Sequence, residues 1–287
     1  MLYPLNCRGT LLDLSQPRIM GILNVTPDSF SDGGRYLDPA HALAQAERMA
    51  AEGADLIDIG GYSSRPGAAH ISAAEELDRI GPVIEGVRRV LPGMLISADT
   101  FRPEVAEAAL GLGAHLINDI SAGRGLEGAE DSGMLALLAG YPDVPLILMH
   151  MQGTPQTMQQ APAYADVCSE VHQFFVARIN AARRAGLRDL ILDPGFGFGK
   201  SLAHNYLLVE HFARFRTLGQ PLLAGLSRKS MLYRLFGAGP EDVLPQATAL
   251  HLKVLESGAN LLRVHDVEAA VRLVRMYAFM KHAHGTV

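Results

Sequence analysis

Short apolar runs rich in β-branched residues recur along the chain at fairly even intervals. Runs of this length and composition predict β-strands. They lie at residues 19–24, 55–60, 94–99, 115–119, 145–150, 189–193, 221–227 and 260–265. The hydrophobic pattern therefore predicts eight strands spread over the whole chain.

Segments rich in Ala, Leu and Glu, with apolar residues at helical spacing, fill the gaps between these runs. The clearest helices are predicted at residues 39–53, 71–91, 102–113, 244–258 and 266–283. Several predicted helices end in a glycine beside the next strand, a position that suits a left-handed residue closing a helix. These glycines are Gly53, Gly113, Gly186 and Gly258.

The alternation of strands and helices predicts the fold. Strands joined by crossover helices must be parallel, and eight such units favour a (β/α)8 TIM barrel that forms a single domain over residues 1–287. A doubly wound open sheet is the alternative, and periodicity alone does not distinguish the two. Residues 5–14 predict an N-terminal hairpin across the bottom of the barrel.

Composition and charge narrow the class of protein. The 287 residues are 48% hydrophobic, which allows one large core, and a formal net charge of −5 without blocks of one sign argues against a nucleic-acid surface. Cys7 and Cys168 lie far apart, so they predict neither a disulfide framework nor a zinc cluster. With no signal peptide and no window of about 18 apolar residues, we expect a reduced, cytoplasmic protein that does not bind membranes.

An unusual number of the predicted strands end in a polar residue. In a TIM barrel the carboxyl ends of the strands form the active-site face. A single polar residue there is more often a helix cap or a hydrogen-bonded core group, but that interpretation does not explain the whole set. The set comprises Asn24, Asp58, Asp99, Asn118 with Asp119, His150, Asp193, Ser227 with Lys229, and Arg263 with His265.

These strand-end residues divide into two chemistries. The side chains of Asp99, Asn118 and Asp193 suit a flat heterocycle whose edge carries N–H donors beside a carbonyl, and Lys229 adds a cation. Basic side chains and the N–H groups of Gly-rich loops suit an anion such as a phosphate. The second set is Arg65, Arg263 and His265. A polar heterocycle with a phosphate tail fits both.

Two long loops, at residues 24–36 and 60–72, are rich in Gly, Pro, Ser and Asp beyond the needs of a short turn. We interpret them as mobile functional loops. The segment DPGFGFGKS at 193–201 superficially suggests a nucleotide P-loop, but Pro194 stands where that motif needs glycine, and the dinucleotide fingerprint also fails.

From Ile19 to His265 the chain resembles the dihydropteroate synthases. The resemblance rests on NVTPDSFSDGG, DIGGYSSRPG, SADT, NDIS, LMHMQGTP, DPGFGFGK, GLSRKS and RVHDV, which occur in family order. It implies a transferase that joins 6-hydroxymethyl-7,8-dihydropterin diphosphate to 4-aminobenzoate, giving 7,8-dihydropteroate and pyrophosphate. Sulfonamides mimic 4-aminobenzoate, so the resemblance also implies a sulfonamide target.

The resemblance carries over roles for individual residues. The pterin ring would be held by Asp99, Asn118, Asp193 and Lys229. The diphosphate would meet Arg65, Arg263 and His265, with Asn24 as a ligand of Mg2+. The 4-aminobenzoate pocket would be framed by Ser64, Phe198, Lys229 and Ser227, with Phe30 and Pro66 on the loops that close over it. The family also implies a homodimer, for which Leu273, Val274, Tyr277 and Phe279 offer an apolar face unless they pack on the barrel.

We expect displacement at the exocyclic CH2 of the pterin, with the C–O bond breaking ahead of attack by the amine. The charge growing on pyrophosphate would be met by Mg2+, Arg263, His265 and loop N–H groups. Asp99 and Asp193 would stabilise the pterin cation. Closure of the two loops should order the aminobenzoate site only after the diphosphate is bound.

Two residues depart from the common family pattern Gly-Gly-Glu-Ser-Thr-Arg-Pro-Gly: Tyr62 replaces the Glu and Ser64 the Thr. Ser64 keeps the hydroxyl, whereas Tyr62 removes a charge and adds a ring. Asp58 is interpreted as orienting the second loop and His150 as a core residue. Two alternatives stay open: a pterin-binding domain of the methyltetrahydrofolate-corrinoid methyltransferase type, and a non-catalytic pterin-binding paralogue.

Overall fold

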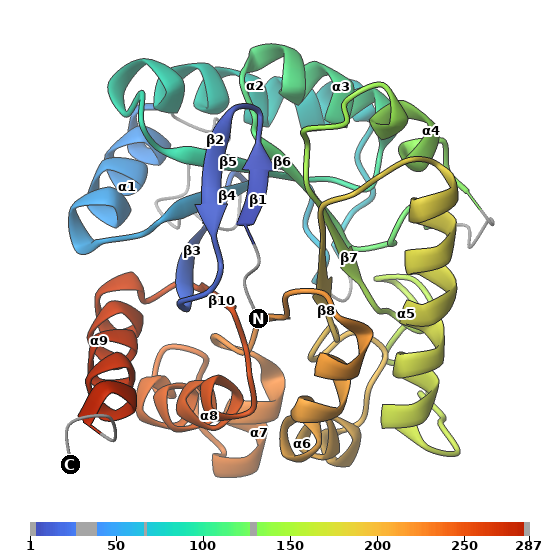
Figure 1. Ribbon diagram of the computed structural model, residues 1–287, viewed down its shortest axis with the longest axis vertical. Coiled ribbons are helices and arrows are strands. Elements are labelled where there is room, and N and C mark those ends of the chain that lie inside the picture. The colour runs from blue at the N-terminus through green and yellow to red at the C-terminus, as the bar shows by residue number, and fades with distance from the viewer. Residues whose placement is uncertain (1–3, 27–38, 66–67, 127–130, 284–287) are drawn as a thin grey trace.

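The computed structural model describes residues 4–26, 39–65, 68–126 and 131–283, and its centre is one sheet of eight parallel strands (Figure 1). The strands are β3 (Arg18–Asn24), β4 (Leu56–Gly60), β5 (Leu95–Asp99), β6 (Leu116–Asp119), β7 (Leu146–Met149), β8 (Leu190–Asp193), β9 (Leu223–Ala224) and β10 (Leu261–Val264). Their order is β8-β7-β6-β5-β4-β3-β10-β9. A parallel bridge between Leu192 and Leu222 joins the two edges, so the sheet closes and the predicted barrel is confirmed.

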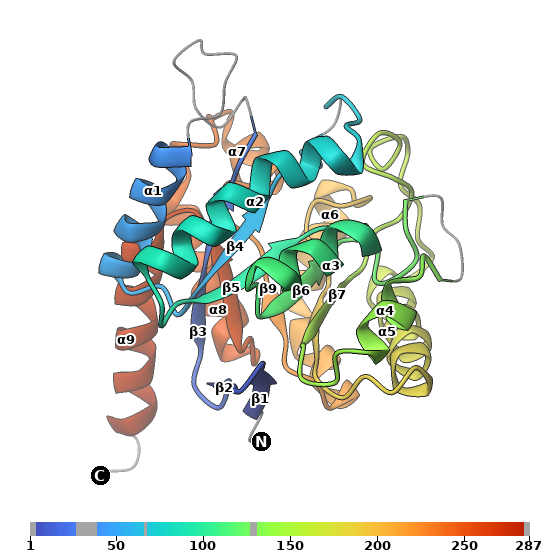
Figure 2. The same ribbon diagram turned by 90° about the horizontal axis from the view of Figure 1, so that it is seen from above.

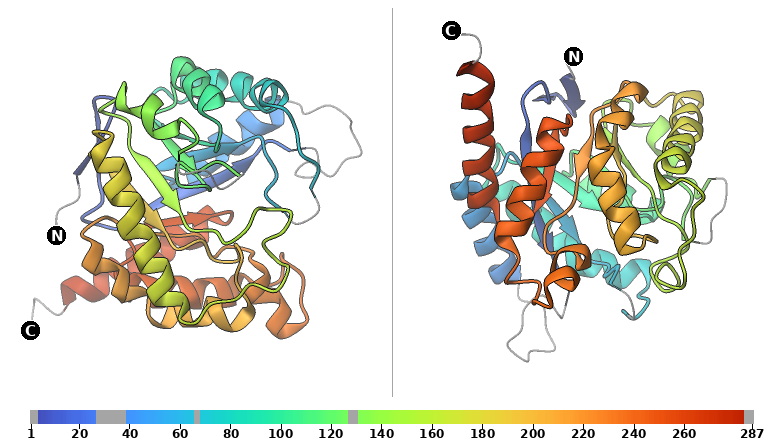
Figure 3. Two further views of the ribbon diagram at one scale, coloured as in Figure 1. Left: turned by 90° about the vertical axis from the view of Figure 1, so that its right-hand side faces the viewer. Right: turned by 90° about the horizontal axis from the view of Figure 1, so that it is seen from below.

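Helices cover the outside of this barrel, as Figures 2 and 3 show. They are α1 (Pro39–Glu52), α2 (Ala73–Val90), α3 (Pro103–Leu112), α4 (Met134–Ala139), α5 (Val167–Arg184), α6 (Leu202–Glu210), α7 (Ser230–Phe236), α8 (Leu244–Glu256) and α9 (Val267–Ala283), with a 3-10 helix at Phe212–Leu218. Between β9 and β10 there are two helices, α7 and α8, where the sequence predicted a single helical segment. No helix in the described ranges has the length and apolar character needed to cross a membrane.

Local signals fix where several helices begin and end. Helix α2 starts after Ser72, whose hydroxyl accepts a hydrogen bond from the Glu75 amide at 3.1 Å. Helix α3 ends at Gly113, which has a φ of 110° and is left-handed as predicted. Helix α6 starts with a capping box in which Ser201 and His204 exchange side-chain and backbone hydrogen bonds. The starts of α2 and α6 therefore set where two loops at the barrel mouth end, and Gly113 sets where the connection from α3 to β6 begins.

The predicted hairpin is present and plugs the barrel. Strand β1 (Pro4–Cys7) pairs antiparallel with β2 (Thr10–Asp13), and Figure 1 shows the pair lying across the barrel strands. Its buried residues pack on a ring to which every barrel strand contributes one side chain. The hairpin side is Leu5, Cys7, Leu12 and Leu14, and the ring is Met20, Leu56, Leu95, Leu116, Ile147, Ile191, Leu223 and Leu261. The hydrophobic seal closes the barrel at the amino ends of its strands.

The same ring determines which residues point into the barrel above it. Side chains alternate along a strand, so residues two positions after a ring member also face inward. Five of these eight inward positions are polar: Asp58, Ser97, Asn118, Asp193 and Arg263. The other three are Ile22, Met149 and Gly225. The intervening strand residues face outward into the main core beneath the helices, as Ile57 and Ile96 do. The hydrophobic floor therefore gives way to a polar interior toward the carboxyl ends of the strands.

Candidate active site

A continuous polar network joins four barrel strands at the mouth. From β10, Arg263 donates from Nε to Asp58 Oδ2 and from Nη2 to Asp99 Oδ2, both at 2.6 Å. Asn118 Nδ2 donates to the same oxygen of Asp58 at 2.9 Å. Predicted residues from β5, β6 and β10 therefore meet, with Asp58 of β4 as the link that sequence reasoning had assigned to loop orientation.

Two atoms of this interior have no hydrogen-bond partner within the described ranges. They are Asp58 Oδ1 and Ser97 Oγ, and both are buried. Leaving a buried polar atom unpaired costs about 1–3 kcal/mol, so such atoms mark places where a ligand can supply the missing donors. Ser97 was not predicted as a site residue, although its spacing of two from both Leu95 and Asp99 on β5 indicates an inward position.

Burial perturbs the ionisation of the groups around this network. It raises the pKa of Asp99 to about 7, because nearby Arg263 only partly offsets the desolvation and Asp58 adds repulsion. Burial also raises the pKa of Asp193. For Lys229, burial and the charge of Arg263 lower the pKa to about 8, against the attraction of Asp193 and Asp99. Charged and neutral forms of Asp99 and of Lys229 are thus close in energy near neutral pH.

The loop after β8 brings an aromatic ring to the predicted cation. Lys229 Nζ lies 4.2 Å from the centroid of Phe198. Asp193, at the end of β8, accepts a hydrogen bond from the Gly195 amide at 2.8 Å. Buried Lys200 donates to His150 Nδ1 and to the Phe198 carbonyl, each at 2.9 Å. Lys200, which sequence reasoning missed, therefore holds Phe198 in place, and His150 has the structural surroundings expected of it.

Ser227 and His265 form a second pair at the mouth. Ser227 Oγ accepts from the His265 amide at 3.1 Å and lies 3.0 Å from His265 Nδ1. The hydroxyl hydrogen can therefore point to Nδ1, which leaves the hydrogen of a neutral imidazole on Nε2. Burial, with the charges of Arg228 and Arg263, lowers the pKa of His265 to about 3. His265 therefore enters the site as a neutral hydrogen-bond donor rather than as a cation.

The remaining predicted residues lie around this centre. Asn24 ends β3, is half-buried and makes no hydrogen bond through its side chain to any other described residue. On the loop between β4 and α2, Ser64 is half-buried and Arg65 is exposed. Phe30 and Pro66 lie outside the described residues. In the described ranges, no group of three or more His, Cys, Asp or Glu residues is arranged to hold a metal.

Comparisons with known proteins agree with this geometry. The sequence profile of the pterin binding enzyme family matches residues 20–265. Dihydropteroate synthase of Escherichia coli strain K12 is 46% identical over 274 residues, covering 94% of this chain and 93% of that protein.

Two solved structures share the whole barrel. The Xanthomonas albilineans dihydropteroate synthase with 4-aminobenzoic acid superimposes with a TM-score of 0.89 at 46% identity, covering 98% of this chain and 99% of that chain. The Yersinia pestis enzyme in a sulfonamide drug complex gives a TM-score of 0.90 at 42% identity, with the same shares covered. The chain therefore belongs to the pterin binding enzyme family, and within it to the dihydropteroate synthases.

Proposed function

We propose that this chain joins 6-hydroxymethyl-7,8-dihydropterin diphosphate to 4-aminobenzoate, releasing pyrophosphate and forming 7,8-dihydropteroate. The observation that carries the proposal is the buried network of Asp58, Asp99, Asn118 and Arg263, together with the buried, unpaired oxygens Asp58 Oδ1 and Ser97 Oγ. A pterin edge offers the N–H donors that these oxygens lack. The dihydropteroate synthases among the comparisons support the same reaction and the same sensitivity to sulfonamides.

In the reaction, the C–O bond between the pterin CH2 and the diphosphate breaks and a C–N bond to the amine forms. The amine nitrogen then releases one proton to solvent. Asp99 and Asp193 favour positive charge on the pterin ring, while the guanidinium of Arg263 and the Nε2–H of His265 favour negative charge on the departing diphosphate. We assign Arg65 to the same diphosphate from the loop above. No covalent enzyme intermediate is required.

The second substrate is assigned to the outer part of the site. Phe198 offers an aromatic face and Lys229 stands above it, so a flat aromatic amine can lie between this wall and the pterin. Ser227 and Ser64 supply hydroxyl groups at the edges of the same space. Phe30 and Pro66 belong to the two loops predicted to close over it.

We assign most ligands of a magnesium ion to the diphosphate of the substrate and to water, and few to the protein. Mg2+ commonly takes one or two protein oxygens and completes its shell with water and substrate phosphates. The amide oxygen of Asn24, at a strand end and unengaged by other described residues, fits that limited role. When bound there with the diphosphate, the ion would supply positive charge to the leaving group.

We also propose that the chain is one domain, cytoplasmic and homodimeric. Of the apolar face predicted on α9, Leu273 is buried in the main core, and Val274 and Tyr277 pack partly against it. Phe279 is 76% exposed, and Phe236 on α7 is 56% exposed, so these two remain to be covered by a partner. Light scattering gives the mass in solution: twice the chain mass supports the dimer, and a single chain mass contradicts it.

The test of the reaction measures pyrophosphate release from the pterin diphosphate in the presence of Mg2+, with and without 4-aminobenzoate. We expect amine-dependent release that a sulfonamide blocks. Replacing Arg263 by Ala should lower kcat/KM by about 100-fold or more, because it removes charge from the leaving group and leaves Asp58 buried without its counter-ion. The control is Arg272→Ala, since Arg272 forms only an exposed pair with Glu268 on α9. Pterin binding without pyrophosphate release would instead favour the non-catalytic or corrinoid-type alternative.

A further inference from the structure

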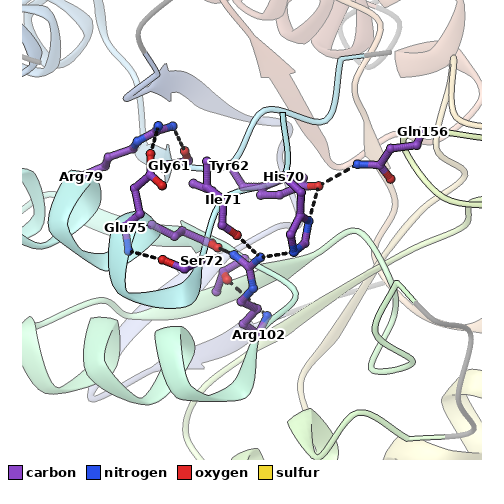
Figure 4. Close-up of polar contacts among 11 residues, drawn as sticks. Gly61, Tyr62, His70, Ile71, Ser72, Glu75, Arg79, Arg102 and Gln156 are labelled. Carbon is purple, nitrogen blue, oxygen red and sulfur yellow. Dashed lines mark hydrogen bonds and ion pairs between the residues drawn. The ribbon is translucent and has the colours of Figure 1, made fainter. Parts of the chain in front are cut away.

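Tyr62, the residue at which this chain departs from the family pattern, begins the loop between β4 and α2 (Figure 4). Its ring meets Phe101 edge to face, with centroids 5.1 Å apart and an interplanar angle of 86°. The guanidinium carbon of Arg102 lies 5.3 Å from the centroid of the same ring. Phe101 and Arg102 lie two and three residues after Asp99, the last residue of β5, so the ring packs against the base of the site.

The hydroxyl of Tyr62 joins two loops. Gln156 Nε2, from the loop between β7 and α5, donates to Tyr62 Oη at 3.0 Å although the residues are 94 positions apart. His70 Nδ1 lies 3.3 Å from the same oxygen. Because Tyr62 and His70 stand near the two ends of one loop, these contacts clamp its base and tie it to the loop after β7.

Arg102 supports this clamp from below, as Figure 4 shows. Its Nη2 donates to the Ile71 carbonyl at 2.6 Å and lies 3.3 Å from His70 Nε2. Its Nη1 forms an ion pair with buried Glu76. An arginine only donates, so Nε2 of His70 accepts and the neutral ring carries its hydrogen on Nδ1, toward Tyr62. Arg102 thus donates a hydrogen bond to His70, and His70 in turn donates one to the Tyr62 oxygen.

A glutamate at position 62, as in the common pattern, could not make the same set of contacts. A carboxylate has no ring to pack on Phe101, and it would compete with Glu76 for the charge of Arg102. In this chain Glu76 already neutralises Arg102, which leaves position 62 to an uncharged aromatic residue. Tyr62 also packs on the small apolar cluster that contains Phe198. The clamp is therefore continuous with the wall assigned to the aromatic amine.

We propose that Tyr62 is a positioning residue that fixes Ser64 at the 4-aminobenzoate side of the site without touching substrate. The proposal rests on the function proposed above. The clamp joins Tyr62 to His70 and Gln156, so its loss frees the start of the loop, which carries Ser64 and Arg65, while the pterin-facing network on the strands stays intact. The amine subsite should respond most, because the pterin diphosphate keeps its contacts with the strands even where Arg65 is loosened.

The test compares wild type with Tyr62→Phe, which keeps the ring and removes the hydroxyl. The KM for 4-aminobenzoate should rise about fivefold, as the loss of one or two neutral hydrogen bonds predicts, while the KM for the pterin diphosphate stays within about twofold. Gln156→Leu should give a similar rise, and the double variant no further rise, because both changes break one link. The matched control is Tyr277→Phe, which removes a hydroxyl bond to the Leu255 carbonyl at 3.0 Å, between α9 and α8.

A measurement of backbone hydrogen exchange separates failure of this proposal from failure of the proposed function. Amides of residues 61–71 should exchange faster in Tyr62→Phe than in wild type, and Tyr277→Phe should leave them unchanged. If wild type shows no amine-dependent turnover but the exchange difference is present, the reaction is wrong and the clamp stands. If wild type is active and Tyr62→Phe has an unchanged KM for the amine, the positioning role is overturned, whatever the exchange shows.

Discussion

At the scale of single residues, the site places ionisable side chains where burial and neighbouring charges oppose one another. Asp99 and Asp193 are pushed toward the neutral acid by burial, and Lys229 toward the neutral amine. Arg263 behaves differently: burial alone would lower its pKa, but Asp58 and Asp99 raise it above the ordinary value. Arg263 therefore keeps its positive charge, whereas the charge of Lys229 depends on pH.

This difference predicts that activity falls on the alkaline side of the pH–rate profile, in what we call its alkaline limb. The pKa of Lys229 is lowered to about 8, so its ammonium is lost as pH rises through that value and kcat/KM for the pterin diphosphate should fall there. Lys229→Arg should be slower but should keep its charge, which moves the limb at least about one pH unit upward. Lys253→Arg, on the exposed Glu210 pair, is the control. An unshifted limb in Lys229→Arg would assign the titration to another group.

At the scale of elements, the site depends on how closely the loop after β8 approaches the end of β7. Gly195 has a φ of 70°, and a Cβ added to it would lie 2.0 Å from the His150 carbonyl oxygen. No side chain fits there unless the two loops separate. The same loop carries Phe198 and is held by Lys200, so its separation from β7 would displace the wall of the amine subsite.

Gly195→Ala should therefore lower both activity and thermal stability, with a drop in unfolding free energy of at least about 1–3 kcal/mol from strain and lost hydrogen bonds. Gly111→Ala is the opposite case, because Gly111 lies in α3 and nothing approaches its added Cβ within 4 Å. That change should stabilise the protein by about 0.5–1 kcal/mol. Denaturant unfolding checks both, and equal effects of the two substitutions would contradict the close approach.

Element by element, hydrophobic periodicity predicted the strands well because each barrel strand is buried on both faces. The seventh strand is the exception, since β9 is confined to Leu223–Ala224 within a predicted run of 221–227. Gly225 and the polar Ser227 that follow already belong to the mouth. The pairing of Arg263 with Asp58 was not predictable in the same way, because it depends on which strand-end side chains reach across β3. Likewise, a motif alone does not show that Lys200 turns back to the Phe198 carbonyl.

At the scale of the whole molecule, one residue connects the barrel floor to the seam, which is the place where the bridge between Leu192 and Leu222 closes the sheet. Asn260 precedes β10; its Oδ1 accepts from the Leu222 amide, and its Nδ2 donates to the Leu14 carbonyl of the hairpin segment, each at 3.0 Å. The residue thus connects the last strand, the seam beside β9 and the plug. If the chain is one cooperative domain, loosening this point should destabilise all of it.

Asn260→Ala should lower the free energy of unfolding by about 1–3 kcal/mol, because it leaves partly buried backbone groups unpaired. Circular dichroism and tyrosine fluorescence should then report one transition at the same, lower midpoint. Thr248→Ala, which removes an exposed bond to the Leu244 carbonyl, should change the midpoint little. Two separated transitions would contradict the single-domain proposal.

The closed floor of the barrel also determines the order in which ligands bind and leave. One end of the barrel is sealed by Leu5, Cys7, Leu12 and Leu14. Ligands therefore enter and leave through the mouth, and the ligand bound deepest must enter first and leave last. The groups assigned to the pterin stand on the strands, and those assigned to the amine stand mostly on the loops above them. We therefore expect ordered binding, in which the pterin enters before the amine and the joined product leaves only once the mouth above it is clear.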